Sequence, residues 1–401
     1  MDPTASSPSW RVPDPAEEIA KIGDLAAESG IRRVCMLAWR DLDDPEAGGS
    51  EVHASTVAAL WGQAGIEVTM RTSYAAGHPQ VSWRDGYRVI RKAGRYMVFP
   101  RAAFSEMMGW HGSRDGLVEI WNGMPFFSPV WGKGPRIVWL HHVHAEMWQM
   151  TLPPRLATMG STVESRIAPR FYRRTPIVTL SESSKRELVD ELGFKPQRVT
   201  VVPPGVDARF APGDAKSATP LVVAAGRLVP VKRFEELIEV LIRVKAQHPR
   251  LEAVIVGEGY RRDDLEAQLR DSGADRWIRL AGHVSDEELL ALYRSAWVVA
   301  SAAAREGWGM TITEAGASGT PAVATRIAGH TDAIVHDHSG LLVDGRDDFV
   351  LALDRVLRDT ELRARLSRGA IEHASRFTWA ATARGTLEVL AADAVRRRGR
   401  P

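Results

Sequence analysis

A glycine-rich turn that carries two glutamates is the strongest chemical signal in the chain. Its sequence is Arg305-Glu306-Gly307-Trp308-Gly309-Met310-Thr311-Ile312-Thr313-Glu314-Ala315, and it follows the apolar run Val298–Ala300. A helix is expected to begin near Met310. The first N–H groups of a helix have no internal partner and its dipole is positive at that end, so the turn suits a diphosphate. Carboxylates accept hydrogen bonds from vicinal hydroxyls, so both glutamates suit recognition of a sugar or a ribose.

A second segment places two cations after another expected strand. Gly226-Arg227-Leu228-Val229-Pro230-Val231-Lys232 follows the apolar run Leu221–Ala225. Open α/β sheets bind ligands beyond the carboxyl ends of their strands, so Arg227 and Lys232 could converge on one diphosphate. Two cations there can stabilise the charge of a departing diphosphate in place of a metal ion. We therefore expect neither a cofactor nor a metal.

Two weaker motifs lie in the first half of the chain. Ala47-Gly48-Gly49-Ser50-Glu51 follows the first strand, opens a helix and resembles a glycine turn that approaches a phosphate. Leu140-His141-His142-Val143-His144 follows another apolar run and places imidazoles at a sheet edge. The glycines could instead only shape a turn, and the histidines could cap a strand or fill a polar core. Zinc is rejected because no carboxylate or cysteine motif completes a ligand set.

Together these motifs resemble the retaining glycosyltransferases of family 4, which have the GT-B fold. The resemblance covers most of the chain and is strongest from about residue 199 to residue 343. It implies that Glu306 contacts hydroxyls of the donor sugar and that Glu314 contacts the ribose. It implies that Arg227 and Lys232 hold the diphosphate, which Gly49 approaches from the opposite domain.

The resemblance also assigns the remaining contacts. His283 and Val284 occupy the loop that meets the nucleotide base, and Arg233 replaces the glycine that usually follows the lysine. A histidine meets the donor sugar in a bacterial subset of the family; His141 and His142 both stay open, with His142 preferred. The expected catalytic residues are Glu306, His142, His141, Arg227 and Lys232. The expected nucleotide-sugar contacts are Gly48, Gly49, Arg227, Lys232, His283, Val284, Gly307, Trp308, Gly309, Met310, Thr311 and Glu314.

The resemblance implies an enzyme that transfers a hexose or amino-hexose, with retention, from a nucleoside diphosphate sugar to a hydroxyl of a small acceptor. UDP is the first choice of nucleotide and GDP the next. The acidic residues Asp41, Asp43, Asp44 and Glu46 could attract a cationic acceptor such as an aminocyclitol, as in antibiotic-type enzymes, or could form a solvated loop. One alternative is an envelope lipid or polysaccharide glycosyltransferase at the membrane surface. Another is a non-catalytic nucleotide-sugar-binding protein. A nicotinamide dehydrogenase is disfavoured because no Gly-x-Gly-x-x-Gly follows the first strand.

The elements that must position these residues alternate between short apolar runs and amphipathic helical stretches, which predicts βα units and parallel sheets. We expect an α/β protein of the GT-B type, with two Rossmann-like doubly wound domains that face a central cleft. An acceptor domain (1–204) and a nucleotide-sugar domain (205–376) are joined at the Pro-Pro-Gly hinge, and a helix within 377–401 crosses back to the first domain. The expected strands are Val34–Ala38, Glu67–Arg71, Tyr87–Ile90, Leu117–Ile120, Ile137–Leu140, Ile177–Leu180, Val199–Val202, Leu221–Ala225, Ala253–Val256, Ile278–Ala281, Val298–Ala300, Ala322–Ala324 and Leu341–Val343.

Composition bounds the remaining choices. The 401 residues include 52 Lys and Arg and 50 Asp and Glu, a net charge of +2, which disfavours nucleic acid as a partner. One cysteine, Cys35, cannot build a disulfide framework, and no apolar run reaches membrane-spanning length, so a cytoplasmic location is expected. The basic residues Arg88, Arg91, Lys92 and Arg95 leave membrane contact open. The oligomeric state is also open.

Overall fold

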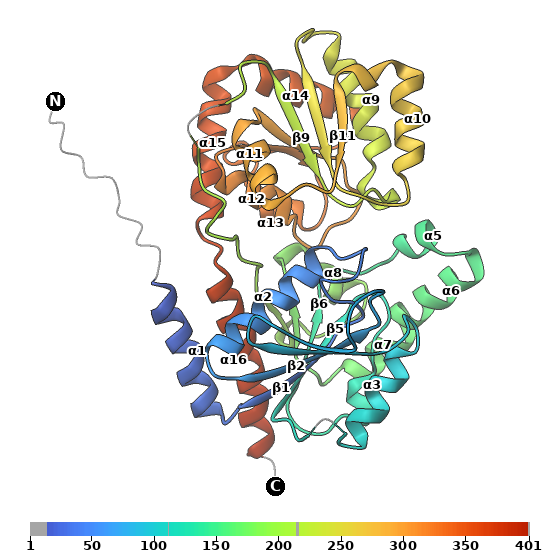
Figure 1. Cartoon of the computed structure of the whole chain (residues 1–401), viewed down its shortest axis with the longest axis vertical. Coiled ribbons are helices and arrows are strands. Elements are labelled where there is room, and N and C mark those ends of the chain that lie inside the picture. Colours follow the sequence, from blue (N-terminus) through green and yellow to red (C-terminus); the bar gives the residue numbers. More distant parts are fainter. Residues whose placement is uncertain (1–13, 111, 214–215, 400–401) are drawn as a thin grey trace, which may run out of the picture.

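Two separate sheets, one in each half of the chain, organise the molecule (Figure 1). The structure is a computed structural model that describes residues 14–110, 112–213 and 216–399. Helices cover both faces of each sheet, and the two α/β domains lie one above the other along the long axis (Figure 1). The predicted pair of parallel-sheet α/β domains is therefore confirmed.

The N-terminal sheet has eight strands and reverses its strand order between β1 and β5. Every pairing is parallel except that of β3 with β4, which is antiparallel, with Val81 opposite Ile90. The sequence analysis missed β3, because it is a short, largely exposed edge strand that depends on the hairpin turn at Asp85-Gly86. In sheet order the strands are β3 (Val81–Arg84), β4 (Tyr87–Ala93), β2 (Glu67–Ser73), β1 (Arg33–Leu37), β5 (Gly116–Trp121), β6 (Arg136–Leu140), β7 (Ile177–Thr179) and β8 (Val199–Val201).

Helices of uneven length surround this sheet, and several are interrupted. The segment that follows β6 is built from short helical pieces, including a π-helical turn, η1. The helices of this domain are α1 (Pro15–Ser29), α2 (Gly49–Gln63), α3 (Val98–Met107), α4 (Ser128–Trp131), α5 (Met147–Thr151), α6 (Pro154–Thr162), η1 (Val163–Ile167), α7 (Ala168–Tyr172), α8 (Glu182–Asp190) and the short turn η2 (Pro196–Arg198).

The C-terminal sheet has six parallel strands in the doubly wound order, with the reversal between β9 and β12. All six were expected from their apolar runs, because strands buried on both faces have near-continuous hydrophobic sequences. In sheet order they are β11 (Ile278–Gly282), β10 (Glu252–Val256), β9 (Leu221–Ala225), β12 (Val298–Ser301), β13 (Ala322–Thr325) and β14 (Gly340–Val343).

Amphipathic helices pack on this second sheet. In α9, Phe234, Leu237, Ile238, Leu241 and Val244 are buried at intervals of three and four residues, so one face lies on the sheet. The helices are η3 (Pro230–Lys232), α9 (Phe234–Lys245), α10 (Arg262–Ser272), η4 (Ala274–Arg276), α11 (Asp286–Ser295), α12 (Met310–Ala317), α13 (His330–Ala333), α14 (Arg346–Arg358) and α15 (Thr360–Ala374).

The last helix, α16 (Trp379–Arg398), leaves the C-terminal domain and runs beside α1 and α2 (Figure 1). Trp61 Nε1 of α2 donates to the carbonyl of Ala383 at 3.0 Å, and Asp393 accepts from the backbone N–H of Arg136 at 3.0 Å. The chain therefore crosses between the domains twice, once near Gly205 and once near Thr378, and Val206 and Thr378 form a parallel bridge at the crossing.

A helix that crosses a bilayer must be both long enough and apolar enough to span it. None of the helices built from residues 14–110, 112–213 and 216–399 meets both requirements.

Candidate active site

Several of the predicted site residues follow strands that flank the two reversals of strand order. In the C-terminal domain, Gly226–Lys232 follows β9 and the 302–309 turn follows β12. In the N-terminal domain, Gly48 and Gly49 lie between β1 and α2, and Asn122 follows β5. Open α/β sheets bind ligands at such switch points, so both domains offer their binding edges.

The glycine turn before α12 has the geometry expected of a diphosphate site. Gly309 adopts φ 114°, which favours glycine, and caps a helix that starts at Met310 without a side-chain cap. The first N–H groups of α12 are therefore free of a capping side chain. A Cβ at Gly307 would stand 2.7 Å from the carbonyl oxygen of His141, so only glycine allows the turn to approach the N-terminal domain this closely.

The two glycines after β1 meet the C-terminal domain directly. A Cβ at Gly48 would lie 3.2 Å from Nε of Arg227, and one at Gly49 would lie 3.2 Å from the sulfur of Met310. The Glu51 carboxylate accepts from the Gly48 N–H at 2.8 Å and so fixes the turn. The structure thus brings together the glycine turns of both domains and the predicted cation Arg227.

Lys232 and Glu306 form an ion pair at this meeting point. Burial alone would raise the pKa of Glu306, but the Lys232 ammonium outweighs it and holds that pKa below its ordinary value. Burial and the neighbouring Arg40 lower the pKa of Arg227. A site that places two half-buried cations, Arg227 and Lys232, beside Glu306 is suited to bind further negative charge.

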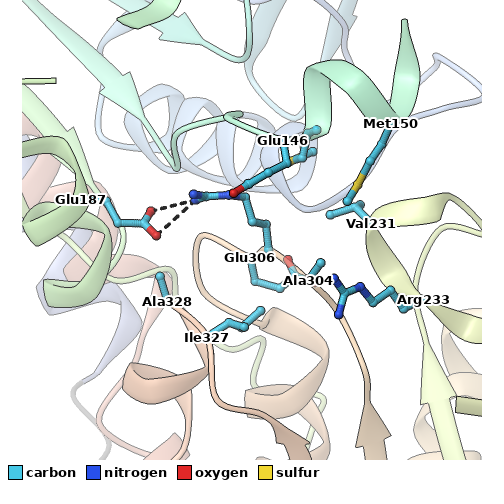
Figure 2. Close-up of a pocket in the computed structure, with 11 residues that line it drawn as sticks. Glu146, Met150, Glu187, Val231, Arg233, Ala304, Glu306, Ile327 and Ala328 are labelled. Carbon is cyan, nitrogen blue, oxygen red and sulfur yellow. Dashed lines mark hydrogen bonds and ion pairs between the residues drawn. The ribbon is translucent and has the colours of Figure 1, made fainter. Parts of the chain in front are cut away.

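A cavity of about 340 Å³ opens beside Glu306. Figure 2 shows Glu146 and Met150 of the N-terminal domain on one side of the cavity, and Arg233, Glu306 and Ala328 of the C-terminal domain on the other. The volume lies in the range of small-molecule sites. Both domains therefore contribute to one pocket at the predicted donor residue.

The structure separates the roles of the two candidate histidines. His141 is buried, its Nε2 lies 3.1 Å from Nδ1 of His53, and burial lowers its pKa to about 4. The Nε2 of His142 is buried without a hydrogen-bond partner. Burial, with the nearby charges of Arg305 and Lys232 adding to it, lowers the pKa of His142 well below 6.5. His142 is thus a neutral imidazole with a free nitrogen, whereas His141 belongs to a core pair.

The other predicted contacts differ in their placement. Glu314 lies one turn inside α12, and burial raises its pKa to about 7. Thr311 is half-buried in the first turn of the same helix. His283 is exposed after β11, and Val284 packs on the core; no hydrogen bond or ion pair within the described residues joins either to the rest of the site.

Trp308 departs from the expectation that it contacts the nucleotide sugar. Its side chain is 4% exposed and packs edge-on against Phe377 in a hydrophobic cluster. Only its backbone can line the turn.

Two buried carboxylates that sequence reasoning missed hold the N-terminal loops. Glu164 accepts from the backbone N–H groups of His144 and Ala145 at 2.9 and 3.2 Å and from Trp148 Nε1 at 2.9 Å. Burial would raise the pKa of Glu164, but His144 outweighs it and lowers that pKa. Nothing in the sequence around residue 164 signals this role, because its partners lie sixteen to twenty residues away.

Glu119 holds the loop after β5 in the same way. It accepts from the N–H groups of Phe126 and Ser128 at 2.6 and 3.1 Å and from the Tyr172 hydroxyl at 2.5 Å. Its position inside an apolar strand was a usable signal, since a carboxylate there must find partners. The loop that it fixes carries Asn122, whose Nδ2 donates to Ser50 at 3.2 Å beside the glycine turn.

Arg305 links the domains. Its Nε lies 2.9 Å from the Glu146 carboxylate and its Nη1 lies 3.1 Å from that of Glu187. The Asp332 carboxylate, in the C-terminal domain, accepts from the Glu182 N–H at 2.9 Å. These contacts join the two domains across the cleft.

The acidic loop could attract a cationic acceptor or be solvated, and the structure pairs most of its carboxylates with arginines. Asp41 is 4% exposed and binds Arg91 Nε at 2.7 Å, while Asp43 also pairs with Arg91, and Glu46 pairs with Arg95. Arginines therefore already compensate the charges of Asp41, Asp43 and Glu46, which disfavours the hypothesis of a cationic acceptor. The same pairs remove Arg91 and Arg95 from the basic cluster that had left membrane contact open.

Comparison with known proteins identifies the class. The two α/β domains, with strand-end cations and glycine turns at a shared cleft, define a GT-B glycosyltransferase that uses a nucleotide sugar. Residues 47–210 match the family described as Glycosyltransferase Family 4, and residues 207–373 match Glycosyl transferases group 1.

The relatives agree with this assignment. A D-inositol 3-phosphate glycosyltransferase of Acidothermus cellulolyticus is 36% identical over 431 residues, covering 93% of this chain and 94% of that protein. One from Stackebrandtia nassauensis is 38% identical over 247 residues, 55% of each chain. The chain therefore belongs to the family 4 glycosyltransferases and is a glycosyltransferase enzyme. These relatives are not named as antibiotic-type enzymes, so the comparisons give that expected subclass no support.

Solved structures share the fold. Sucrose-phosphate synthase from Thermosynechococcus elongatus superposes with a TM-score of 0.76 at 17% identity, covering 92% of this chain and 98% of that one. Anabaena HepE in complex with UDP-glucose gives 0.69 at 17% identity, covering 89% and 98%. At this identity the likeness extends to the fold alone, and it confirms the predicted GT-B architecture.

Proposed function

We propose that this enzyme transfers a hexose, with retention of anomeric configuration, from a UDP-sugar to a hydroxyl of a cyclitol or cyclitol phosphate. The observation that carries the proposal is the cluster of Arg227, Lys232 and Glu306 at the start of α12, which faces Gly48 and Gly49 across the cleft. GDP is the second choice of nucleotide.

Each group of the cluster has a role in this reaction. The bond between the anomeric carbon and the diphosphate breaks, and Arg227, Lys232 and the first N–H groups of α12 stabilise the departing charge without a metal. The acceptor hydroxyl bonds to the anomeric carbon on the same face, and its proton passes to a phosphate oxygen. Glu306 and the free Nε2 of His142 bind sugar hydroxyls.

The names of the relatives support a polyhydroxylated acceptor that carries a phosphate. The cavity beside Glu306 is lined by two cations, Arg233 and Arg305, and by three glutamates. Arg305 is already paired with two of these glutamates and with Glu191. Arg233 has a weaker partner, Glu236 at 3.6 Å, and its side chain is 40% exposed. We therefore assign Arg233 to an anionic acceptor. The aminocyclitol expected from the acidic loop has no such support.

A transfer assay tests the proposal. Purified protein is incubated with UDP- or GDP-hexoses and with inositol 3-phosphate, unphosphorylated inositol or a lipid acceptor, with chelator present, and products are identified by mass spectrometry and anomeric NMR. The proposal predicts an α-linked product from an α-linked donor on a cyclitol. Binding of UDP without any product would favour the non-catalytic alternative, and product only on the lipid would favour the envelope alternative.

A further inference from the structure

One side of the N-terminal domain combines exposed apolar side chains with unpaired arginines. Figure 1 shows α3, α7 and α6 along one edge of this domain. Phe104, Met107, Met108, Trp110, Met159 and Phe171 are each 49–57% exposed. With Arg101, Arg155, Arg166, Arg170, Arg173 and Arg174 they form what we call the apolar–basic face.

The face is continuous across several short elements. α3 packs against α4, α4 packs against α7, and η1 joins α7 to α6. The rings of Phe104 and Trp110 meet edge-on at 5.4 Å, and those of Phe127 and Phe171 meet edge-on at 5.7 Å. These contacts make one surface of segments that are some sixty residues apart in sequence.

The helix α3 shows how the surface is built. It buries Val98, Ala102 and Ser105 against the domain. Arg101, Phe104 and Met108 follow at intervals of three and four residues and are exposed. A helix that lies flat with apolar and basic residues outward is typical of an interfacial helix at a membrane.

The exposed charges of the face all have the same sign. None of its six arginines forms an ion pair with any residue from the described ranges of the chain, whereas arginines elsewhere mostly do. Within α3, α4, α6, η1 and α7, all fully described, the acids are Glu106 and Glu164. Their side chains are 8% and 2% exposed, and both are bonded inward. The exposed charge of the face is therefore purely positive.

A second copy of the chain is a poor occupant of this surface. A twofold interface places the same patch on both sides, so six unpaired arginines would face six others. We infer that the apolar–basic face docks on an anionic lipid bilayer, with the arginines at the headgroups and the aromatic and methionine side chains in the interfacial layer. The proposed sugar transfer does not depend on this inference.

Docking would place the cleft beside the lipid headgroups. α6 packs on α5, and α5 contacts η3, which carries Lys232 and borders the cavity beside Glu306. The face thus begins at the mouth of the cleft and extends away from it to α3. A bilayer on this side leaves the C-terminal domain in solution.

Vesicle cosedimentation tests the inference with the full chain. We expect binding to phosphatidylcholine vesicles that contain phosphatidylglycerol, little binding to phosphatidylcholine alone, and loss of binding at high salt. The triple variant Arg170→Gln/Arg173→Gln/Arg174→Gln should bind about a hundredfold more weakly, at about fivefold per charge. Met108→Glu/Trp110→Glu should also lose binding, and the tryptophan fluorescence of the wild type should shift to the blue on binding.

Two control variants test whether a loss of vesicle binding is specific to the apolar–basic face. Arg243→Gln/Arg270→Gln/Arg358→Gln removes three exposed charges from the C-terminal domain, and Leu351→Glu changes an apolar side chain there that is 65% exposed. Both should bind vesicles as the wild type does, and thermal midpoints check that every variant folds. The inference is overturned if the wild type ignores anionic vesicles, if both face variants bind normally, or if the face instead mediates a dimer in solution.

Discussion

The two domains position the residues that face the cleft by different means. In the C-terminal domain, the functional groups emerge directly at strand ends or helix starts: Arg227 and Lys232 after β9, and Glu306 and Glu314 around the start of α12. In the N-terminal domain, the loops that face the cleft are tied down by buried carboxylates, of which Glu164 is the clearest case.

The surfaces differ as well. Within the described residues of the C-terminal domain, the exposed large apolar side chains are Tyr260, Val335 and Leu351, and most arginines are paired. The N-terminal domain carries many more, several of them on the apolar–basic face. The comparison shows that the exposed apolar surface lies mainly on the N-terminal domain, whereas most exposed arginines of the C-terminal domain are paired.

The largest effect is expected where the C-terminal domain meets the departing charge. Lys232→Ala should lower kcat by about 10³-fold, because a preorganised cation at a developing negative charge contributes this much. Steady-state turnover measures it. Arg243→Ala, on the exposed side of α9, serves as the control and should retain activity; a Lys232→Ala enzyme with near-normal kcat would contradict the assignment.

A change in the N-terminal domain should separate loop order from donor binding. Glu164→Ala leaves two backbone N–H groups and an indole N–H without their acceptor, so stability should fall by about 3 kcal/mol. Turnover should fall about tenfold or more, since a small misplacement of the His142 loop is costly. UDP affinity should be unchanged. Ser165→Ala, next to it on the exposed side, should alter none of these; loss of UDP affinity in Glu164→Ala would break the proposed division between domains.

The pH dependence of nucleotide binding should report Glu314. Its pKa in the free enzyme is raised to about 7, and the ribose needs the ionised carboxylate, so UDP affinity should rise as pH increases from 6 to 8. Below pH 7 the loss should approach about tenfold per pH unit. Titration calorimetry at several pH values measures it. Glu314→Gln should bind weakly and with no such slope, and an unchanged slope in that variant would assign the titration to another group.

The smallest effect is expected at Arg233. Arg233→Gly, which suits the left-handed backbone at φ 50°, should raise KM for a cyclitol phosphate about fivefold and leave KM for the unphosphorylated cyclitol unchanged. Comparison of the two acceptors in one assay gives the answer. Equal effects on both acceptors would show that Arg233 shapes the pocket without meeting a phosphate.

The same contrast between local and distant contacts explains which features could be predicted from the sequence. Strands such as β9 and β12 were predicted because they are buried on both faces. The positions of Arg227, Lys232 and Glu306 at the strand ends could be predicted because these residues directly follow the strands in the sequence. Glu164 and Arg305 were missed because their roles depend on partners distant in the chain. The pairing of Asp41 with Arg91, which disfavours a cationic acceptor at the acidic loop, was missed for the same reason. The burial of the Trp308 side chain could not be predicted, because a motif does not show which way a side chain turns.

The central claim is that the C-terminal domain binds a nucleoside diphosphate through Arg227, Lys232 and Glu314 without a metal. Titration of UDP and GDP into the wild type and into Lys232→Ala, with chelator present, tests it most directly. We predict saturable binding of one of the two nucleotides to the wild type and binding at least about tenfold weaker to the variant. Binding that requires magnesium, binding equally tight in Lys232→Ala, or no binding of either nucleotide would contradict the account.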